Sequence, residues 1–160
     1  MRRFELNDVY LTLTEQVAKK MLSYIQNTPD KPEAGGILLG YYFGNNQFSI
    51  VEVSTPSSED KATRYGFVRS KTKAQKLVRE KFVNSKGKII YLGEWHTHPE
   101  EFPTPSCIDR KSILERTTKD TLNSDVIFMI IVGYIGVYIA AVNKEGFLAE
   151  SMFNLTTENR

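Results

Sequence analysis

Two histidines and an aspartate are the clearest candidates for chemistry in this chain. His96 and His98, its only histidines, flank Thr97, and Asp109 follows eleven positions after the second. Residues two apart on a β-strand point to the same face, so both imidazoles would converge. Two histidines and one carboxylate leave a fourth tetrahedral position for water, which is the pattern of a catalytic zinc site. A His-x-His pair alone is more often a solvent-facing or hydrogen-bonded pair.

The segment between the histidines and the aspartate could bring the carboxylate of Asp109 close to the imidazoles. Pro99 ends the expected strand, and Pro103 and Pro105 stiffen the loop that follows. Ser106 is placed to cap a helix whose first turn contains Asp109. By itself this pair is an ordinary capping box, in which the acid favours the helix dipole. Together with the histidines it predicts one zinc ion and an activated water that is a nucleophile at neutral pH.

These residues resemble the JAMM motif of the JAB/MPN metalloprotease domain, which reads Glu, then His-x-His, ten residues and Asp. The ten residues here are 99–108, and the family's serine three positions before the aspartate corresponds to Ser106. The family's upstream acid corresponds to Glu33, which precedes a Gly-Gly pair and an apolar run. Every element of the motif is present, and the match extends from Glu33 to Asp109.

The resemblance implies a role for each residue of the motif. The metal ligands would be His96, His98 and Asp109. The catalytic residues would be Glu33, which passes a proton from the attacking water to the departing amine, and Ser106, which helps to stabilise the oxyanion. Without the resemblance, Glu33 would be interpreted as a solvent-facing loop acid and Ser106 as a helix cap alone. The implied fold is a cytidine-deaminase-like JAB/MPN sandwich.

A closer resemblance is to the bacterial JAB isopeptidases encoded in CBASS anti-phage operons. It rests on two short segments, Arg64-Tyr65-Gly66-Phe67 and Gly93-Glu94-Trp95-His96. It implies cleavage after the C-terminal glycine of a ubiquitin-like modifier or conjugated protein. The partners it implies are a conjugated cGAS-like nucleotidyltransferase and an E1–E2 conjugation protein. A deconjugase of another bacterial ubiquitin-like or sulfur-carrier system is an alternative, because its members could share such short segments.

Other residues compete for roles near the site. Glu94 shares strand parity with the histidines and could be the base or a ligand in place of Glu33, or hold an imidazole by a hydrogen bond. Cys107 lies near a helix N-terminus and could be a nucleophile, although a buried, inert thiol is the favoured interpretation. A cysteine hydrolase would leave the spacing of Asp109 without a purpose. Some MPN domains are binding scaffolds that have lost a metal ligand, whereas this chain has them all.

The composition indicates one globular domain. Of the 160 residues, 41% are hydrophobic and 25% are charged, which is ordinary for such a domain. We expect a single domain over residues 1–153 and a polar tail over 154–160. One cysteine excludes an internal disulfide and suits a reducing compartment. The first residues lack the apolar run of a signal peptide, so a cytoplasmic location is expected.

One long apolar run requires a choice between a membrane span and a sheet. The 17 residues Val126–Val142 carry no charge and reach the short limit for a transmembrane helix. Nine of them are Val or Ile, however, and Gly133 and Gly136 interrupt the run. This pattern favours two buried strands joined by a turn, and no membrane partner.

The remaining patterns predict an α/β sandwich in which a sheet of mixed pairing is flanked by helices. Helices are expected at about 14–27, 72–83 and 107–122. Strands are expected at about 9–13, 36–43, 48–53, 65–68, 89–98, 126–132, 137–142 and 147–153. The strands 36–43 and 48–53 would form a hairpin through Gly44-Asn45-Asn46.

Positive charge is concentrated in residues 61–88. This segment contains ten Lys or Arg residues and a single acid, Glu80. Because most of these cations lie on or beside the second predicted helix, the favoured interpretation is a solvated helix face. The alternative is an electropositive surface that meets an acidic protein partner. Nucleic acid is the less favoured partner, because no nucleic-acid-binding motif accompanies the charge.

Overall fold

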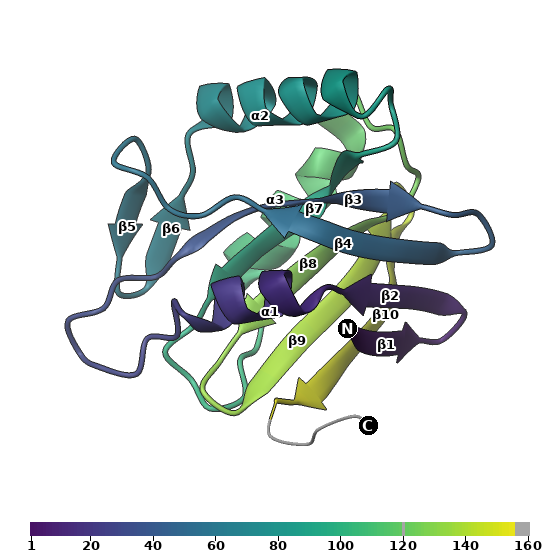
Figure 1. Ribbon diagram of the computed structural model, residues 1–160. Coiled ribbons are helices and arrows are strands. Elements are labelled where there is room, and N and C mark those ends of the chain that lie inside the picture. Colours follow the sequence, from purple (N-terminus) through teal and green to yellow (C-terminus); the bar gives the residue numbers. More distant parts are fainter. Residues whose placement is uncertain (120, 156–160) are drawn as a thin grey trace.

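The computed structural model describes residues 1–119 and 121–155 (Figure 1). Its strands are β1 (Arg2–Leu6), β2 (Val9–Leu13), β3 (Gly35–Tyr42), β4 (Gln47–Val53), β5 (Lys61–Thr63), β6 (Gly66–Val68), β7 (Ile90–Thr97), β8 (Ile127–Val132), β9 (Gly136–Asn143) and β10 (Gly146–Asn154). Its helices are α1 (Glu15–Leu22), α2 (Lys71–Asn84) and α3 (Cys107–Lys119). Eight strands form one mixed sheet in the order β1-β2-β4-β3-β7-β8-β9-β10, and β5 pairs with β6 separately.

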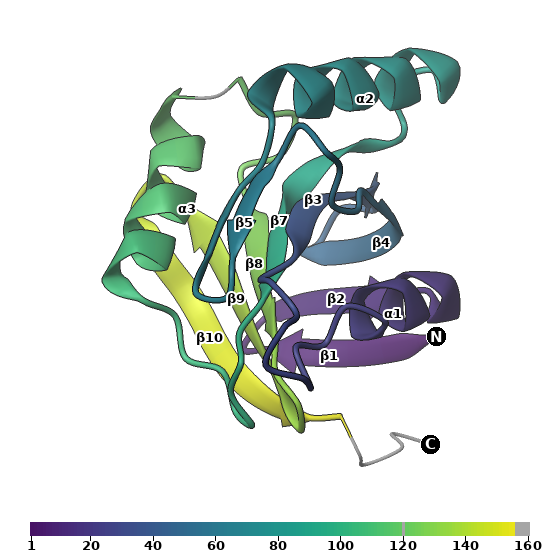
Figure 2. The same cartoon turned by 90° about the vertical axis from the view of Figure 1, so that its left-hand side faces the viewer.

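Hydrophobic side chains form a core on each face of the large sheet. On one face Val17 of α1 belongs to the cluster that contains Phe128 of β8. On the other face Ile113 of α3 packs with the cluster that contains Ile127. Neighbouring residues of β8 therefore face opposite sides, as strand geometry requires. Figure 2 shows α1 and α3 on opposite sides of the sheet, which confirms the predicted α/β sandwich of mixed pairing.

The apolar run 126–142 forms two strands of the sheet. β8 and β9 pair antiparallel from Ile127↔Val142 to Val132↔Val137, and both strands are almost entirely buried. Within the described residues, no helix has the length and apolar character needed to cross a membrane. The hairpin predicted for 36–43 and 48–53 is confirmed by the antiparallel pairing of β3 with β4.

Several element bounds differ from the sequence-based expectations. The short strands β1 and β5 were not predicted, since neither carries a long apolar run. Helix α1 ends at Leu22 rather than near Asn27, because the hydroxyl of Ser23 donates to the Lys20 carbonyl at 2.7 Å and competes with the helical bonds. Helix α3 is described to Lys119, and the chain is no longer helical at Leu122.

The C-terminal prediction is only partly covered by the structure. β10 extends to Asn154, so the strand includes the first residue of the predicted tail. Residues 156–160 of that tail lie outside the described residues. The division into one domain over 1–153 and a tail stays a prediction.

The centre of the sheet brings the upstream acid to the histidines. β3 and β7 are antiparallel neighbours, and Gly35 lies opposite His96 in the ladder. A Cβ atom at Gly35 would lie 2.5 Å from the Trp95 carbonyl oxygen, so only glycine allows this close approach. Because Glu33 lies two positions before Gly35, it reaches the end of β7 where the histidines stand.

Candidate metal centre

The two histidines and the aspartate converge at the end of β7. The Nε2 atoms of His96 and His98 are 3.1 Å apart. One carboxylate oxygen of Asp109 lies 3.3 Å from Nε2 of His96, and the other lies 3.2 Å from Nε2 of His98. The three side chains are 12–16% exposed, so they form a recess that solvent can reach.

The spacing of these donor atoms fits a tetrahedral zinc ion. Bonds of about 2.0–2.1 Å to nitrogen and oxygen place neighbouring ligand atoms of a tetrahedron roughly 3.3 Å apart. The nitrogen–nitrogen separation is 3.1 Å, and the nitrogen–oxygen separations, each to a different oxygen of Asp109, are 3.3 and 3.2 Å, all close to that edge length. Two nitrogens and one carboxylate are also a donor set that zinc prefers, and they leave one tetrahedral position open. The predicted ligand set is therefore geometrically able to hold the ion.

A reciprocal capping box fixes the position of Asp109. Its backbone N–H donates to Oγ of Ser106 at 3.0 Å, and the Ser106 N–H donates to a carboxylate oxygen of Asp109 at 2.9 Å. Burial opposes ionisation of this acid, but hydrogen bonds from both histidines and from the Ser106 backbone prevail and lower the pKa of Asp109 well below its usual range. The aspartate is therefore held as an anion, the form a metal ligand needs.

The loop that joins β7 to α3 is anchored on the turn between β8 and β9. The backbone N–H of Tyr134 donates to the Glu100 carbonyl at 2.8 Å, and that of Ile135 donates to the Glu101 carbonyl at 2.9 Å. Pro103 is buried in the same loop. These contacts set where α3 begins, and therefore where its first turn places the carboxylate.

Glu33 lies beside the histidines and is buried. Its side chain belongs to a cluster with His96 and His98 whose potential ligand atoms all lie within 4.8 Å of one another. Its backbone N–H donates to the Thr63 carbonyl at 2.7 Å, and the residue is 5% exposed. Burial raises the pKa of Glu33 above its ordinary value, and the two histidines only partly offset this. A carboxylate whose pKa is raised towards neutrality can both accept and return a proton.

A buried hydrogen-bond chain ties the Glu33 segment to the metal strand. The Ala34 N–H donates to Oγ1 of Thr97 at 2.9 Å, and that hydroxyl donates to Oε1 of Gln26 at 2.9 Å. The amide nitrogen of Gln26 donates to the Arg64 carbonyl at 2.8 Å. Gln26 and Thr97 are both fully buried. Neither residue was singled out in the sequence, because their contact spans 71 positions.

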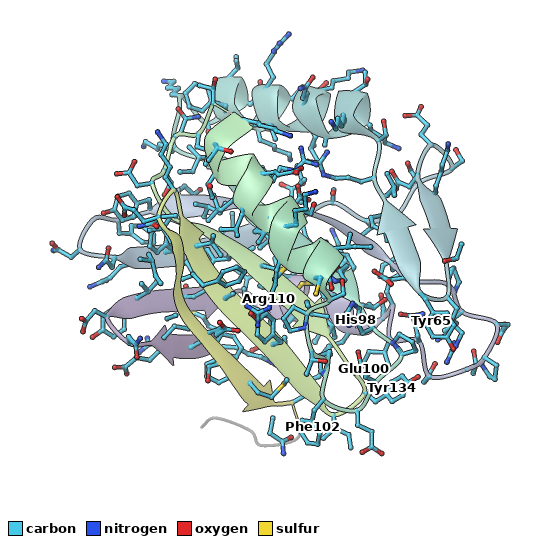
Figure 3. The ribbon with its side chains drawn as sticks, turned by 180° about the vertical axis from the view of Figure 1, so that it is seen from behind. Tyr65, His98, Glu100, Phe102, Arg110 and Tyr134 are labelled. Atoms are coloured by element: carbon cyan, nitrogen blue, oxygen red, sulfur yellow. The ribbon has the colours of Figure 1, made fainter. Side chains whose placement is uncertain are left out.

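Glu100, and not Glu94, contacts a ring nitrogen of His98. Nδ1 of His98 lies 3.0 Å from a carboxylate oxygen of Glu100, and a partner at this nitrogen fixes the orientation of a ligand imidazole. Figure 3 shows His98 and Glu100 near the N-terminal end of α3. Glu94 instead accepts hydrogen bonds from Arg69 at 2.7–3.0 Å and from the hydroxyl of Tyr91 at 3.0 Å.

Cys107 is exposed, so the expectation of a buried thiol is wrong. It is the first residue of α3, directly after the capping serine, where its side chain can point to solvent.

A cavity of about 230 Å³ lies beside the metal centre and is lined from three sides. Glu33, His96 and Asp109 contribute from the metal centre, Phe67 and Val68 from β6, and Ile108, Ser112 and Arg116 from α3.

The sequence matches a family model described as prokaryotic homologs of the JAB domain over residues 14–146. A relative from Escherichia coli (strain TW11681), named CD-NTase/cGAS isopeptidase, is 36% identical over 132 residues, which are 82% of this chain and 81% of the relative. A relative of the same name from Vibrio cholerae is 32% identical and covers 87% of this chain and 86% of its own length. A protein from Sinorhizobium fredii, named probable metalloprotease, is 29% identical over 63% of this chain and 62% of its own length.

A solved structure supports the fold alone. The solution structure of a protein from Desulfitobacterium hafniense superposes with a TM-score of 0.58 and covers 94% of both chains. Its sequence identity is 18%, which is too low to carry any argument about activity.

Proposed function

The chain belongs to the prokaryotic JAB family, and from this premise we propose that it is a zinc-dependent isopeptidase. The observation that carries the proposal is the convergence of both imidazoles and the Asp109 carboxylate, whose nitrogen–nitrogen and nitrogen–oxygen separations are 3.1–3.3 Å. A scaffold would have no need to keep three such donors beside a buried acid. The proposed reaction is hydrolysis of an amide bond that follows a C-terminal glycine.

The proposed role of each residue follows from where its side chain lies. The two histidines and Asp109 would hold the zinc ion, which would supply Lewis-acid chemistry and activate the attacking water. Glu33 accepts a proton from the attacking water, and its raised pKa then allows it to protonate the departing amine. Breaking the C–N bond in this way leaves a carboxylate on one product and a free lysine on the other.

Ser106 is proposed to have two functions. Its Oγ accepts the Asp109 N–H and so positions the ligand. Its own hydroxyl proton can still be donated, and Ser106 is exposed at the edge of the recess. Donation to the developing oxyanion would stabilise the tetrahedral stage of the reaction.

The substrate proposed is a protein carrying a C-terminal glycine that is joined to a lysine. Three relatives that cover most of this chain are named CD-NTase/cGAS isopeptidase. We therefore propose that the conjugated protein is a cGAS-like nucleotidyltransferase, that an E1–E2 protein makes the conjugate, and that the reaction takes place in the cytoplasm as part of anti-phage defence.

The test measures metal content and cleavage on the same preparations. Purified protein should contain about one zinc per chain by elemental analysis. A nucleotidyltransferase tail that ends in glycine and is joined to a lysine peptide should be cleaved, phenanthroline should abolish cleavage, and added zinc should restore it. Iodoacetamide should spare activity, although Cys107 is exposed. Cleavage that resists chelation, or a metal-free protein that cannot be loaded, would exclude the proposed mechanism.

A further inference from the structure

A second cavity, of about 610 Å³, lies between α2 and α3 and is strongly cationic. Five of the residues that line it are Arg or Lys, and none of the described residues that line it is acidic. The five cations are Arg69, Lys71, Arg79, Arg116 and Lys119. We call this cavity the cationic groove. Of the cations in residues 61–88, only Arg69, Lys71 and Arg79 line this groove.

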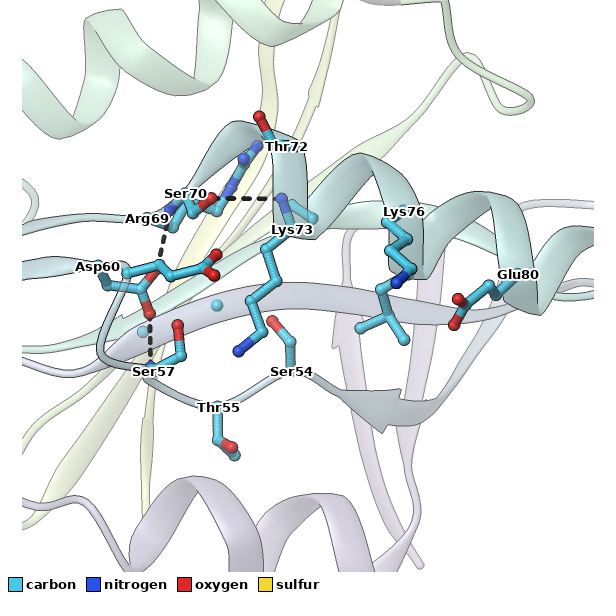
Figure 4. Close-up of a pocket in the computed structure, with 15 residues that line it drawn as sticks. Ser54, Thr55, Ser57, Asp60, Arg69, Ser70, Thr72, Lys73, Lys76 and Glu80 are labelled. Atoms are coloured by element: carbon cyan, nitrogen blue, oxygen red, sulfur yellow. Dashed lines mark hydrogen bonds between the residues drawn. The ribbon is translucent and has the colours of Figure 1, made fainter.

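The two faces of α2 differ in how their charges are balanced. The opposite face borders a cavity of about 450 Å³ in which Lys73 and Lys76 lie together with Glu59, Asp60 and Glu80 (Figure 4). That cavity contains both signs of charge, whereas the described residues that line the cationic groove carry only positive charge. The excess of positive charge is therefore directed towards α3 and is not spread evenly around the helix.

The cationic groove is continuous with the cavity beside the metal centre. Arg69, Lys71 and Arg116 line both cavities. Arg69 and Arg116 also contact Glu94, at 2.7 and 3.5 Å, and all three side chains are at most 21% exposed. Arg69 and Arg116 form the floor that the two cavities share. Lys71 and Arg79 are exposed, and no ion pair joins either to an acid within the described chain.

Apolar surface in the cationic groove favours a polypeptide over a small anion. Helix α2 has no buried residue, and Val78 and Phe82 line the groove while remaining partly exposed. Leu122 and Ala74 line it as well. A free phosphate would gain nothing from these side chains, whereas an extended peptide could cover them and place carboxylates against the cations.

The length of the path matches an extended tail better than a single lysine side chain. Arg116 and Lys119 follow Asp109 on α3 by seven and ten positions, which are about 10 and 15 Å at 1.5 Å per residue. A lysine side chain reaches only roughly 6 Å along its four-carbon stem. An extended tail rises about 3.3 Å per residue, so the path corresponds to about three to five residues of the C-terminal tail.

We propose that the cationic groove binds an acidic stretch located about three to five residues before the scissile glycine of the substrate tail. This inference rests on the proposed isopeptidase function, because that function defines the scissile bond. The inference adds to that function the charge of the tail that the enzyme would select.

Binding of two labelled peptides tests the groove without requiring cleavage. Both peptides end in glycine, and they differ only in having glutamate or glutamine at the third to fifth positions before the end. In fluorescence anisotropy at about 50 mM salt, the glutamate peptide should bind about threefold to tenfold more tightly, since two exposed ion pairs contribute modestly. The preference should shrink at about 500 mM salt, because screening is stronger.

Two double variants that remove the same charge show which face of α2 is responsible for the preference for glutamate. Lys71→Gln with Arg79→Gln should abolish the preference for glutamate, whereas Lys73→Gln with Lys76→Gln removes the same charge from the opposite face of α2 and should preserve it. Equal affinity for the two peptides, loss of the preference in both variants, or no binding of either peptide would overturn the inference.

The same sequences as lysine conjugates separate this inference from the proposed function. Faster cleavage of the glutamate conjugate, by kcat/KM, would support both. If zinc-loaded protein distinguishes the peptides but cleaves neither conjugate, the proposed function fails and the groove remains an acidic-peptide site. If both conjugates are cleaved equally and the peptides bind equally, the function stands and the groove inference fails.

Discussion

Replacing Thr97 with valine tests whether the buried chain from Gln26 to Ala34 positions the catalytic acid. Valine has nearly the shape of threonine but has no hydroxyl. The change leaves two buried groups without their partner, the Ala34 N–H and Oε1 of Gln26, each of which now makes a 2.9 Å bond to Thr97. An unpaired buried group costs about 1–3 kcal/mol, so we expect the free energy of unfolding to fall by about 3 kcal/mol. For a domain of this size that corresponds to a Tm lower by about 6–12 °C.

The same substitution should reduce turnover without removing the metal. Ala34 adjoins Glu33, so loss of its bond to Thr97 loosens the segment that carries the base, while the side chains of His96 and Asp109 are untouched. Misplacement of a catalytic group by about 1 Å can lower the rate by roughly 10²-fold. We therefore expect zinc content near that of the wild type and kcat reduced by about 10-fold to 10²-fold.

Thr97→Ser is the matched control, because it keeps the hydroxyl and loses one buried methyl group. It should cost about 1 kcal/mol and leave kcat within about threefold. Unfolding in urea is measured on zinc-free protein, since bound metal would add its own stabilisation. Zinc content and turnover are measured on loaded protein. If the valine and serine variants have equal stability and equal kcat, the hydroxyl does not position Glu33. If the valine variant loses zinc, Thr97 instead supports the ligands.

Four further predictions concern the metal centre and the groove floor. Glu33→Gln should keep zinc and fold but lower kcat by at least about 10²-fold, because an amide cannot carry the proton; near-full turnover would move the base elsewhere. Glu100→Gln should weaken zinc binding by about 10-fold in a chelator competition, since it changes the partner of Nδ1 of His98, and an unchanged affinity would contradict this. Glu94→Gln should keep zinc and most of kcat but lower the stability of the zinc-free protein, because Arg69 loses an ionised partner; a variant as inactive as Glu33→Gln would refute that assignment. Replacing the terminal glycine of a conjugate by valine should stop cleavage, and equal rates would mean that no narrow channel leads to the metal.

The convergence of His96, His98 and Asp109 could be predicted from the sequence because their geometry is local. Strand parity fixes the relation of His96 to His98, and a capping box fixes Asp109 in the first turn of α3. Only the loop between them is irregular, and its anchor on the β8–β9 turn comes from a distant part of the chain. A spacing pattern can encode such a site even when the path of the loop cannot be derived.

The residues that support the site could not be predicted in the same way. Gln26 meets Thr97 across 71 positions, and nothing near Gln26 in the sequence indicates a buried amide. Glu100 lies only two positions after His98, but Pro99 between them ends the strand, so strand parity gives no guide to its direction. Side-chain contacts of this kind depend on tertiary packing, which periodicity does not describe.

Strand β7 shows why Glu94 and Tyr91 lie on one face and why that face continues into the groove. Leu92 and Trp95 are three positions apart, yet both belong to the core cluster on the α1 side. The register with β3 shifts at this point, and Gly93 there has a φ of +129°, so a β-bulge reverses the alternation of side chains. Tyr91 consequently shares a face with Glu94, and its hydroxyl donates to that carboxylate.

The bulge extends one face of β7 from the metal centre into the cationic groove. His96 and Glu94 line the cavity beside the metal, and Tyr91 lines the groove beyond it. A Cβ atom at Gly93 would lie against the Phe128 carbonyl oxygen, so any other residue would force β7 away from β8. Without the bulge, Tyr91 would turn towards the opposite core, and Glu94 would lose a hydrogen bond that holds it against Arg69 rather than near the imidazoles. A single glycine therefore lets Tyr91 and Glu94 share one face, so that this face of β7 continues towards α2.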